Sequence, residues 1–436
     1  MKPDSSRQVS RRMELAREWD RLVDQVRETV PGFQDFMRRP SLDSLLPAAA
    51  AGSVVMLNVS PWRSDALIVT TAGVRNLRLP RLTLDEATAR ANHYLETLHE
   101  AERKGQEYLD ALDEAHARPT AAAIRAQSHA AHDLMHAECR TDQMLQAMQE
   151  WLWDTVAAPV LEEIGLVGKP PAGTEWPRLW WCPTGPLTLL PLHTAGYHGT
   201  AESPLPLTVL DRAVSSYTPT LRALLQARTE HRPSAAEAAT DRLLVVAVEE
   251  ATGQPRLHSV DRELQALSQL VTPGRLTVLR GTDADRRSVC EELERHQWVH
   301  FICHGDQNLA QPSEGGLLMS DATLTVRDIS ARHFRGEFAG LSACKTAVGG
   351  KELLDETITL ATALHYSGYR HVVAALWSVD DEAAADVFTF LYGELAVDGT
   401  LRAQGVAPAL HRAVRDLRAA HPHEPRLWTP FAHIGP

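Results

Sequence analysis

Residues 298–305 read WVHFICHG, and residues 338–346 read FAGLSACKT. Each segment begins as a short apolar run of the kind that forms a buried β-strand, and each runs into a residue with reactive chemistry, His304 or Cys344. In an open parallel sheet, ligands bind at the carboxyl ends of the strands. The interval between the two segments leaves room for a crossover connection between parallel neighbours. The pattern therefore predicts that the imidazole and the thiol face one crevice.

The sequence on either side of these segments alternates between short apolar runs and amphipathic stretches. Strands are expected at residues 243–248, 276–279, 298–303, 338–343 and 371–376. Helices are expected at residues 260–271, 285–296, 356–367 and 381–396. This alternation predicts an α/β fold with a mostly parallel sheet that is flanked by helices.

The sequence before residue 242 does not show this regular alternation of short strands and helices. A charged, helix-permissive segment is predicted at residues 1–45, followed by a folded part at residues 46–230 and a linker at residues 231–241. Within the folded part, strands are expected at residues 53–59 and 66–70, in a strand–turn–strand unit at 176–192 and in a strand pair at 207–217. Two or three long helices form an insertion at about residues 84–165. A second core-forming part is predicted at residues 242–436.

Length, composition and charge limit the classes of function that the chain can have. The chain has 436 residues, of which 44% are apolar and 23% charged, and its net charge is −12 with no basic run. This composition argues against nucleic acid or an anionic membrane as a partner. No segment reaches the ~18 apolar residues of a membrane span, and the N-terminus lacks the apolar core of a secretory signal. Five cysteines without a CxxC pair then indicate free thiols in a reducing, cytoplasmic compartment.

The His and Cys segments together predict nucleophilic catalysis. A thiol becomes a good nucleophile once a nearby imidazole accepts its proton, which assigns Cys344 as nucleophile and His304 as its partner. Gly305 lets the backbone approach a substrate, so the N–H groups of Gly305 and Cys344 are the predicted oxyanion hole. A Cys with its His some 50 residues upstream is also the local pattern of caspases.

Four segments of the second part carry a resemblance to a known family. They are HFICHG (300–305), LSACKT (341–346), YRHVVAALWSVDD (369–381) and WTPFAHIGP (428–436). They resemble the CHAT domain family, a caspase-like (clan CD) group of cysteine peptidases that includes relatives of separase, and PRLWWCPTGPLTLLPLHTAG (177–196) is similar to the first half of CHAT domains. The resemblance implies a caspase-like fold in which a pseudo-protease half, here 46–230, precedes the catalytic half. It also implies the His304–Cys344 dyad, a protein or peptide substrate, and regulation by other domains or partners.

Several other residues have both a functional and a structural interpretation. Five residues near the strand ends are candidates for a substrate pocket: Trp377, Asp380, Asp381, Asp355 and Glu356. For Asp380 the structural alternative is that it caps the helix that begins at Asp381, and for Trp377 it is core packing. Cys303 and His300 are expected to be structural, since strand alternation turns Cys303 away from His304.

No metal or organic cofactor is expected. His129, His132, His136 and Cys139 share one helix face, but no second ligand cluster accompanies them, which favours a solvated face over a metal site. A catalytically inactive caspase-like signalling scaffold is the alternative to the peptidase. A weaker alternative is an α/β-hydrolase-like esterase, because Gly340, Ser342 and Cys344 follow the nucleophile-elbow spacing without its final glycine.

Overall fold

A computed structural model describes residues 5–30, 37–38, 40–229, 242–251, 254–306, 311–342 and 359–436. Residues Met1–Leu45 and Leu46–Pro436 form two separate units. The first unit contains helices α1 (Ser5–Thr29) and α2 (Leu42–Leu45). The second unit contains the sheet and the site described below.

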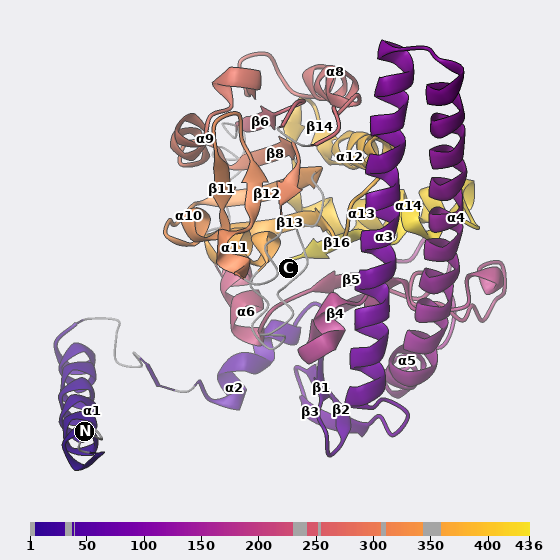
Figure 1. Ribbon diagram of the computed structural model, residues 1–436. Helices are drawn as coiled ribbons and strands as arrows, with labels where there is room; N and C mark the ends of the chain where they lie inside the picture. Colours follow the sequence, from indigo (N-terminus) through magenta and orange to yellow (C-terminus); the bar gives the residue numbers. More distant parts are fainter. Residues whose placement is uncertain are drawn as a thin grey trace. The chain divides into compact units, whose positions relative to one another are not determined.

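One eleven-stranded sheet runs through the second unit in the order β3-β2-β1-β4-β5-β16-β13-β12-β8-β6-β7 (Figure 1). In chain order its strands are β1 (Ser53–Val59), β2 (Ser64–Thr70), β3 (Gly73–Arg78), β4 (Arg178–Pro183), β5 (Val214–Tyr217), β6 (Leu243–Ala247), β7 (Leu276–Arg280), β8 (Trp298–Ile302), β12 (Gly336–Ser342), β13 (Tyr369–Ala375) and β16 (Phe431–Ile434). The pairs β1–β2, β2–β3 and β13–β16 are antiparallel, and the other neighbours in this order are parallel. The prediction of an α/β fold with a mostly parallel sheet is confirmed.

The central strands are buried along their whole length because helices cover both faces of the sheet. Every residue of β6, β8 and β13 is buried. One face packs against α9 (Arg286–Leu293), α10 (Val326–Ser330) and α11 (Leu360–Tyr366), and the other against α8 (Val260–Leu270), α12 (Asp381–Leu395) and α13 (Val406–Ala420) (Figure 1). Successive residues of β8 therefore alternate between two hydrophobic cores, with Phe301 on the α9 side and Ile302 on the α8 side.

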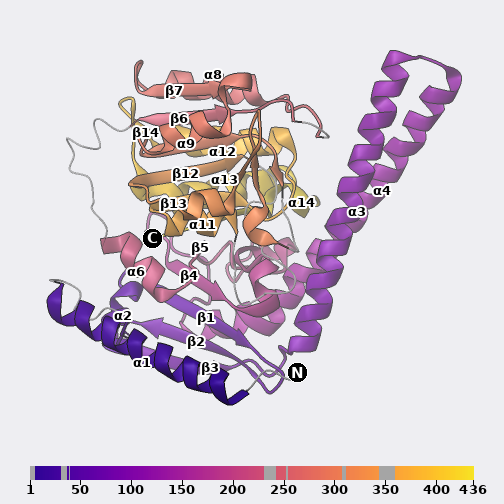
Figure 2. The same ribbon diagram turned by 60° about the vertical axis from the view of Figure 1, so that its left-hand side comes forward.

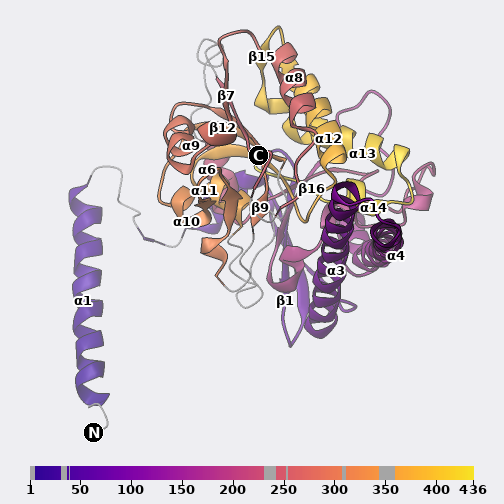
Figure 3. The same ribbon diagram turned by 45° about the horizontal axis from the view of Figure 1, so that its top comes forward.

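The predicted helical insertion is a pair of long antiparallel helices, α3 (Leu84–Ala117) and α4 (Ala121–Leu152), which run side by side (Figures 2 and 3). Thr83 and Thr120 cap their N-termini, each accepting a backbone N–H through its side chain. The short helix α5 (Ala158–Glu163) follows. None of the helices in the described ranges is long and apolar enough to cross a membrane.

The last strand joins the two parts of the sheet. β16 pairs in parallel with β5, from the first predicted half, and antiparallel with β13, from the second. A buried ion pair crosses the same boundary, since Arg418 of α13 donates to both carboxylate oxygens of Asp211 at 2.7 Å. One sheet thus spans both predicted halves, and their division at residues 231–241 stays a prediction.

Two local predictions in the first half are wrong. The second strand expected within the strand–turn–strand unit at residues 176–192 is a pair of 3₁₀ turns, Gly185–Leu189 and Leu192–Thr194, because Pro186 and Pro191 cannot donate to a strand ladder. Of the strand pair expected at residues 207–217, only β5 is a strand of the sheet. The small sheet of β9 (Gly305–Asp306), β10 (Gly316–Leu318) and β11 (Thr323–Thr325) was not anticipated from the sequence.

Candidate active site

The two strands that carry the predicted dyad are parallel neighbours. β8 and β12 pair in a register that places Phe338 opposite Trp298 and Ser342 opposite Ile302. His304 follows Ile302 by two residues, and Cys344 follows Ser342 by the same two residues. Cys344 itself lies outside the described residues, as do Asp355 and Glu356. The described parts of both strands therefore end at one edge of the sheet.

His304 is held in a defined tautomer at this edge. Its side chain is only 5% exposed, and its Nε2–H donates to the carbonyl oxygen of Pro255 at 2.7 Å. The other ring nitrogen, Nδ1, is then the acceptor of the neutral imidazole. Burial lowers the pKa of His304 below its ordinary value, against the Pro255 carbonyl and the Asp381 carboxylate, which raise it. The imidazole is thus neutral near pH 7 and able to take up a proton at Nδ1.

Gly305 is fixed by the small sheet beside His304. Leu318 donates its N–H to the His304 carbonyl at 2.9 Å, and Gly305 lies opposite Leu317. In an antiparallel ladder, the residue next to a hydrogen-bonded position points its N–H away from the partner strand. The N–H of Gly305 is therefore not used by β10, which is what an oxyanion donor at this position requires.

The described candidates for a substrate pocket have partners within the protein. Asp380 accepts the N–H of Ala383 at 3.0 Å, so the alternative that it caps α12 is confirmed. Asp381 accepts hydrogen bonds from the segment that precedes α8. Trp377 is buried, with its ring 5.7 Å from that of Tyr94 of α3 in an edge-to-face contact. Core packing accounts for Trp377.

The other reactive side chains near the dyad strands are structural. Cys303 is buried in the core on the α9 side, the face opposite to that of Ile302 and His304. His300 lies in β8, four residues before His304, and its Nε2 is 2.8 Å from Oε2 of the buried Glu263 of α8. In the first half, Cys182 donates its thiol to the Pro219 carbonyl, and burial raises the pKa of that thiol to about 12. Cys182 is thus not a nucleophile.

Glu263 was missed from the sequence. It is buried and accepts from Ser342 Oγ at 3.3 Å as well as contacting His300, so it links α8 to the end of β12 and to the middle of β8. A signal was available, because Glu263 occupies the apolar stripe of its helix between Val260 and Leu267, where a carboxylate is costly unless it is paired.

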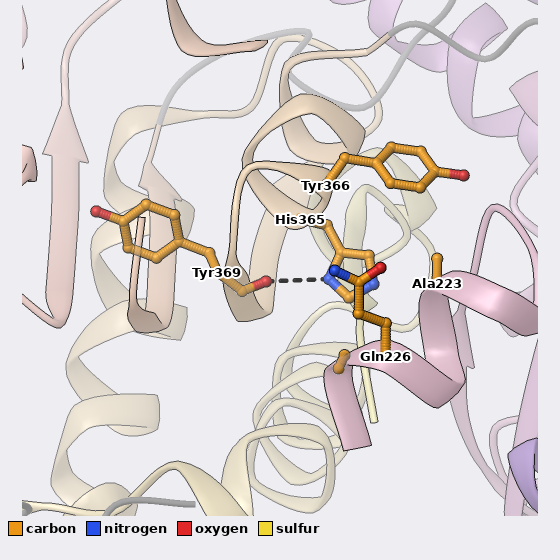
Figure 4. A pocket seen from close by; sticks show the side chains of 6 residues that line it. Ala223, Gln226, His365, Tyr366 and Tyr369 are labelled. Carbon is orange, nitrogen blue, oxygen red and sulfur yellow. Dashed lines mark hydrogen bonds between the residues drawn. The ribbon is translucent and has the colours of Figure 1, made fainter. Parts of the chain in front are cut away.

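Two further features lie apart from the strand ends. On α4, the Nε2 atoms of His132 and His136 are 3.1 Å apart on an exposed face, and the described residues contain no group of three side chains able to hold a metal ion. A shallow pocket lies between α6 (Leu221–Thr229) and α11, where His365 Nδ1 contacts the Tyr369 carbonyl (Figure 4). Tyr369 begins β13, so this pocket is at the sheet edge opposite to His304.

The chain is similar to one known protein family and to solved structures of other proteins. A family model described as the CHAT domain matches residues 146–436. No curated protein matches the chain. Among solved structures, the chain is similar to separase from Saccharomyces cerevisiae in its complex with securin. The 3.0 Å structure gives a TM-score of 0.59 at 10% identity, covering 90% of this chain and 30% of the other.

A second structure of the same yeast complex, at 2.6 Å, gives a TM-score of 0.57 at 11% identity, with coverage of 90% of this chain and 31% of the other. A weaker likeness, with a TM-score of 0.44 at 8% identity, is to the complex of the RgpB pro- and mature domains from Porphyromonas gingivalis, covering 65% of this chain and 69% of the other. The chain thus spans less than a third of the yeast chains. At this identity the similarity to separase concerns the fold, and it confirms the predicted fold class.

Proposed function

The chain belongs to the CHAT domain family, and from that premise we propose that it is a cysteine endopeptidase in which Cys344 and His304 form the catalytic dyad. One observation carries the proposal. His304 stands at the end of β8 with Nε2 committed to the Pro255 carbonyl, beside the strand after which Cys344 follows in the sequence. This arrangement leaves Nδ1 of a neutral imidazole to accept the thiol proton.

The first half-reaction forms an acyl-enzyme. Nδ1 of His304 takes the proton from Sγ of Cys344, and the thiolate attacks the carbonyl carbon of the scissile peptide bond. The electron pair of the C=O bond moves to oxygen, where the N–H groups of Gly305 and Cys344 stabilise it. When the carbonyl re-forms, the C–N bond breaks and the imidazolium gives its proton to the leaving amine. The product is a thioester between the substrate and Cys344.

The second half-reaction releases the acid product. Water loses a proton to Nδ1 of His304 and attacks the thioester carbon. Collapse of the second tetrahedral intermediate breaks the C–S bond, and the proton returns to sulfur. The reaction consumes one water molecule, regenerates the thiol, and needs only groups of the chain itself.

The substrate in this proposal is an extended segment of a protein. It binds along the crevice at the ends of β8 and β12 and pairs with backbone there, as extended peptides do at sheet edges. The candidate acids Asp355 and Glu356, which follow Cys344 in the sequence, favour Arg or Lys before the cleaved bond. Because the yeast separase structures are complexes with securin, a regulatory protein partner is part of the proposal. So is a cytoplasmic location, where the four described cysteines would remain free.

The test is covalent labelling. The purified chain is incubated with acyloxymethyl-ketone peptides bearing Arg, Leu or Asp next to the ketone, and the modified residue is mapped by mass spectrometry. Labelling of Cys344 that is lost in His304→Ala, together with cleavage of matched fluorogenic peptides, supports the dyad. Cys182→Ala is the matched control, because its buried thiol does not ionise near neutral pH, and it should label as the wild type does.

Absence of labelling would favour the alternative, a catalytically inactive scaffold. If no peptide labels Cys344, and Cys344→Ala leaves every biochemical and cellular readout unchanged, the peptidase proposal is wrong and a non-catalytic caspase-like scaffold replaces it. Labelling only by the Asp probe would leave the dyad intact and refute the preference for a basic residue.

A further inference from the structure

A carboxylate bridges the loops on either side of the dyad strands. Asp381 begins α12, after β13, and Ser259 precedes α8, after β6. Asp381 Oδ2 accepts the N–H groups of His258 and Ser259 at 2.7 and 2.8 Å, and Oδ1 accepts the hydroxyl of Ser259 at 2.5 Å. In the sheet, β12 and β8 lie between β13 and β6. The bridge therefore reaches across the two strands that lead to Cys344 and His304.

The segment that Asp381 holds is the one that orients His304. Pro255, whose carbonyl accepts the Nε2–H of His304, lies three residues before His258. The segment has a second attachment, because Leu257 donates its N–H to the Glu249 carbonyl at 3.0 Å. Gln254 also donates its N–H to the Ala251 carbonyl, and Arg256 pairs with Glu250. Release of the Asp381 end would leave Pro255 held through residues 249–251 of its own loop, without the link to α12, so the carbonyl would be less firmly fixed toward the ring.

The loop that carries Asp381 is held in place by its own contacts with the rest of the protein. The loop from β13 to α12 packs against α3 through the contact of Trp377 with Tyr94, and Ser378 donates a hydrogen bond to Glu102. Asp380 then caps α12. The carboxylate is thus placed by contacts with two elements, α3 and α12, before it meets Ser259. Asp381 also acts on the ring through its charge, since it raises the pKa of His304 against the effect of burial.

We propose that Asp381 is a positioning residue for His304: it fixes the segment 255–259 and thereby the tautomer and orientation of the imidazole. This inference rests on the proposed function for its kinetic consequence and on the described contacts for its structural one. It differs from the role considered from the sequence, in which Asp381 would line the substrate pocket. Both carboxylate oxygens already accept hydrogen bonds from the protein.

The kinetic test compares Asp381→Ala, Asp381→Asn and Ser259→Ala on fluorogenic peptides with Arg or Leu before the cleaved bond. We expect Asp381→Ala to lower kcat about 10- to 100-fold on both peptides, because small misplacements of catalytic groups cost that much. Asp381→Asn keeps one acceptor and should fall between it and the wild type. Ser259→Ala removes a donor on the far side of the bridge and should lower kcat in the same direction.

The control variant breaks a neighbouring contact of the same two helices. Asp386 of α12 pairs with Arg262 of α8 at 2.7 Å, at an exposed position that does not touch segment 255–259. Asp386→Asn should stay within about 2-fold of wild-type kcat, as exposed substitutions usually do. A rise in KM for the Arg peptide alone in Asp381→Asn, with kcat unchanged, would assign Asp381 to the substrate pocket and overturn the inference.

A spectroscopic test does not depend on turnover. In full-length protein labelled with ¹⁵N-histidine, the His304 resonances are identified by their loss in His304→Gln, and the ring shifts report which nitrogen carries the proton. We expect the Nε2–H tautomer in the wild type and in Asp386→Asn, and a mixture of tautomers in Asp381→Asn and Ser259→Ala. An unchanged tautomer in both bridge variants refutes the positioning role. If the wild type cleaves nothing, the peptidase proposal fails while this measurement still decides the role of Asp381.

Discussion

Replacing Arg418 by Met should destabilise the second unit by about 3–5 kcal/mol, the usual cost of leaving one member of a buried ion pair without its partner. The pair is bidentate, with both N–O distances at 2.7 Å, and Asp211 is 0% exposed. Thr208 donates a further hydrogen bond to the same carboxylate at 2.6 Å. After the substitution, this hydroxyl and the Arg415 side chain, whose Nε is 3.7 Å from Asp211 Oδ1, would have to balance a fully buried charge.

The effect should depend on pH. Burial alone would raise the pKa of Asp211, but the hydrogen bonds and charge of Arg418, with smaller contributions from Thr208 and Arg415, outweigh it and the pKa is lowered. A lowered carboxyl pKa contributes stability above the pKa of the unfolded chain, and this contribution is lost as the pH falls. In Arg418→Met, Asp211 is instead expected to bind a proton in the folded state. The difference in stability between wild type and variant should therefore shrink from pH 7 to pH 4.

The assay is urea unfolding followed by tryptophan fluorescence at the two pH values. Arg412→Met is the matched control, because Arg412 lies on the same helix and pairs with Glu394 at an exposed position, where ion pairs contribute about 1 kcal/mol or less. The double variant Asp211→Asn, Arg418→Met should regain most of the lost stability. An Arg418→Met variant no less stable than Arg412→Met at pH 7 would falsify this reasoning.

Two further predictions concern other buried groups. Burial lowers the pKa of His193 to about 4 and of His411 to about 3. The unfolded chain therefore binds more protons than the folded chain below pH ~6.5, and the free energy of unfolding falls as the pH drops, by about 3 kcal/mol for His193 alone at pH 4. A urea midpoint that is flat from pH 6.5 to 4.5 would contradict this. In thermal melts, Gly368→Ala should cost about 2 kcal/mol or more, because Gly368 has φ +115° and an added Cβ would lie 2.0 Å from the Phe334 carbonyl oxygen. Gly393→Ala, at an exposed position of α12 with open space around the added Cβ, should be neutral or stabilising. Equal melting temperatures for the two variants would show that the backbone at Gly368 adapts without cost.

The central sheet could be predicted because its signal is local. β6 is a continuous apolar run, and β8 and β13 are apolar except for His300, Arg370 and His371, which is the pattern of strands covered on both faces. β16 could not be predicted in this way. It has four residues, follows Pro430, and contains His433, whose buried ring bonds to His371 and Ser216 of neighbouring strands. Those partners are distant in the sequence, so nothing near residue 433 indicates that its polar ring is satisfied in a core.

The same distinction holds at the candidate site. A His followed by Gly at a strand end is visible in the sequence, and it led to the assignment of His304. The group that orients the ring is a backbone carbonyl, at Pro255, and every residue has one, so no residue type marks it. The bridging role of Asp381 was equally hidden, because its partner Ser259 belongs to a loop more than a hundred residues earlier.

The position of β16 has a consequence for synthesis of the chain. Residues 431–434 follow every other strand of the large sheet in the sequence, yet β16 lies in its interior, between β5 and β13. While a ribosome is still upstream of this strand, the nascent polypeptide holds two sheet fragments with open edges, and open edges invite mispairing with other chains. We therefore expect translation products that stop before residue 431 to aggregate or to be captured by chaperones, even though they contain both His304 and Cys344.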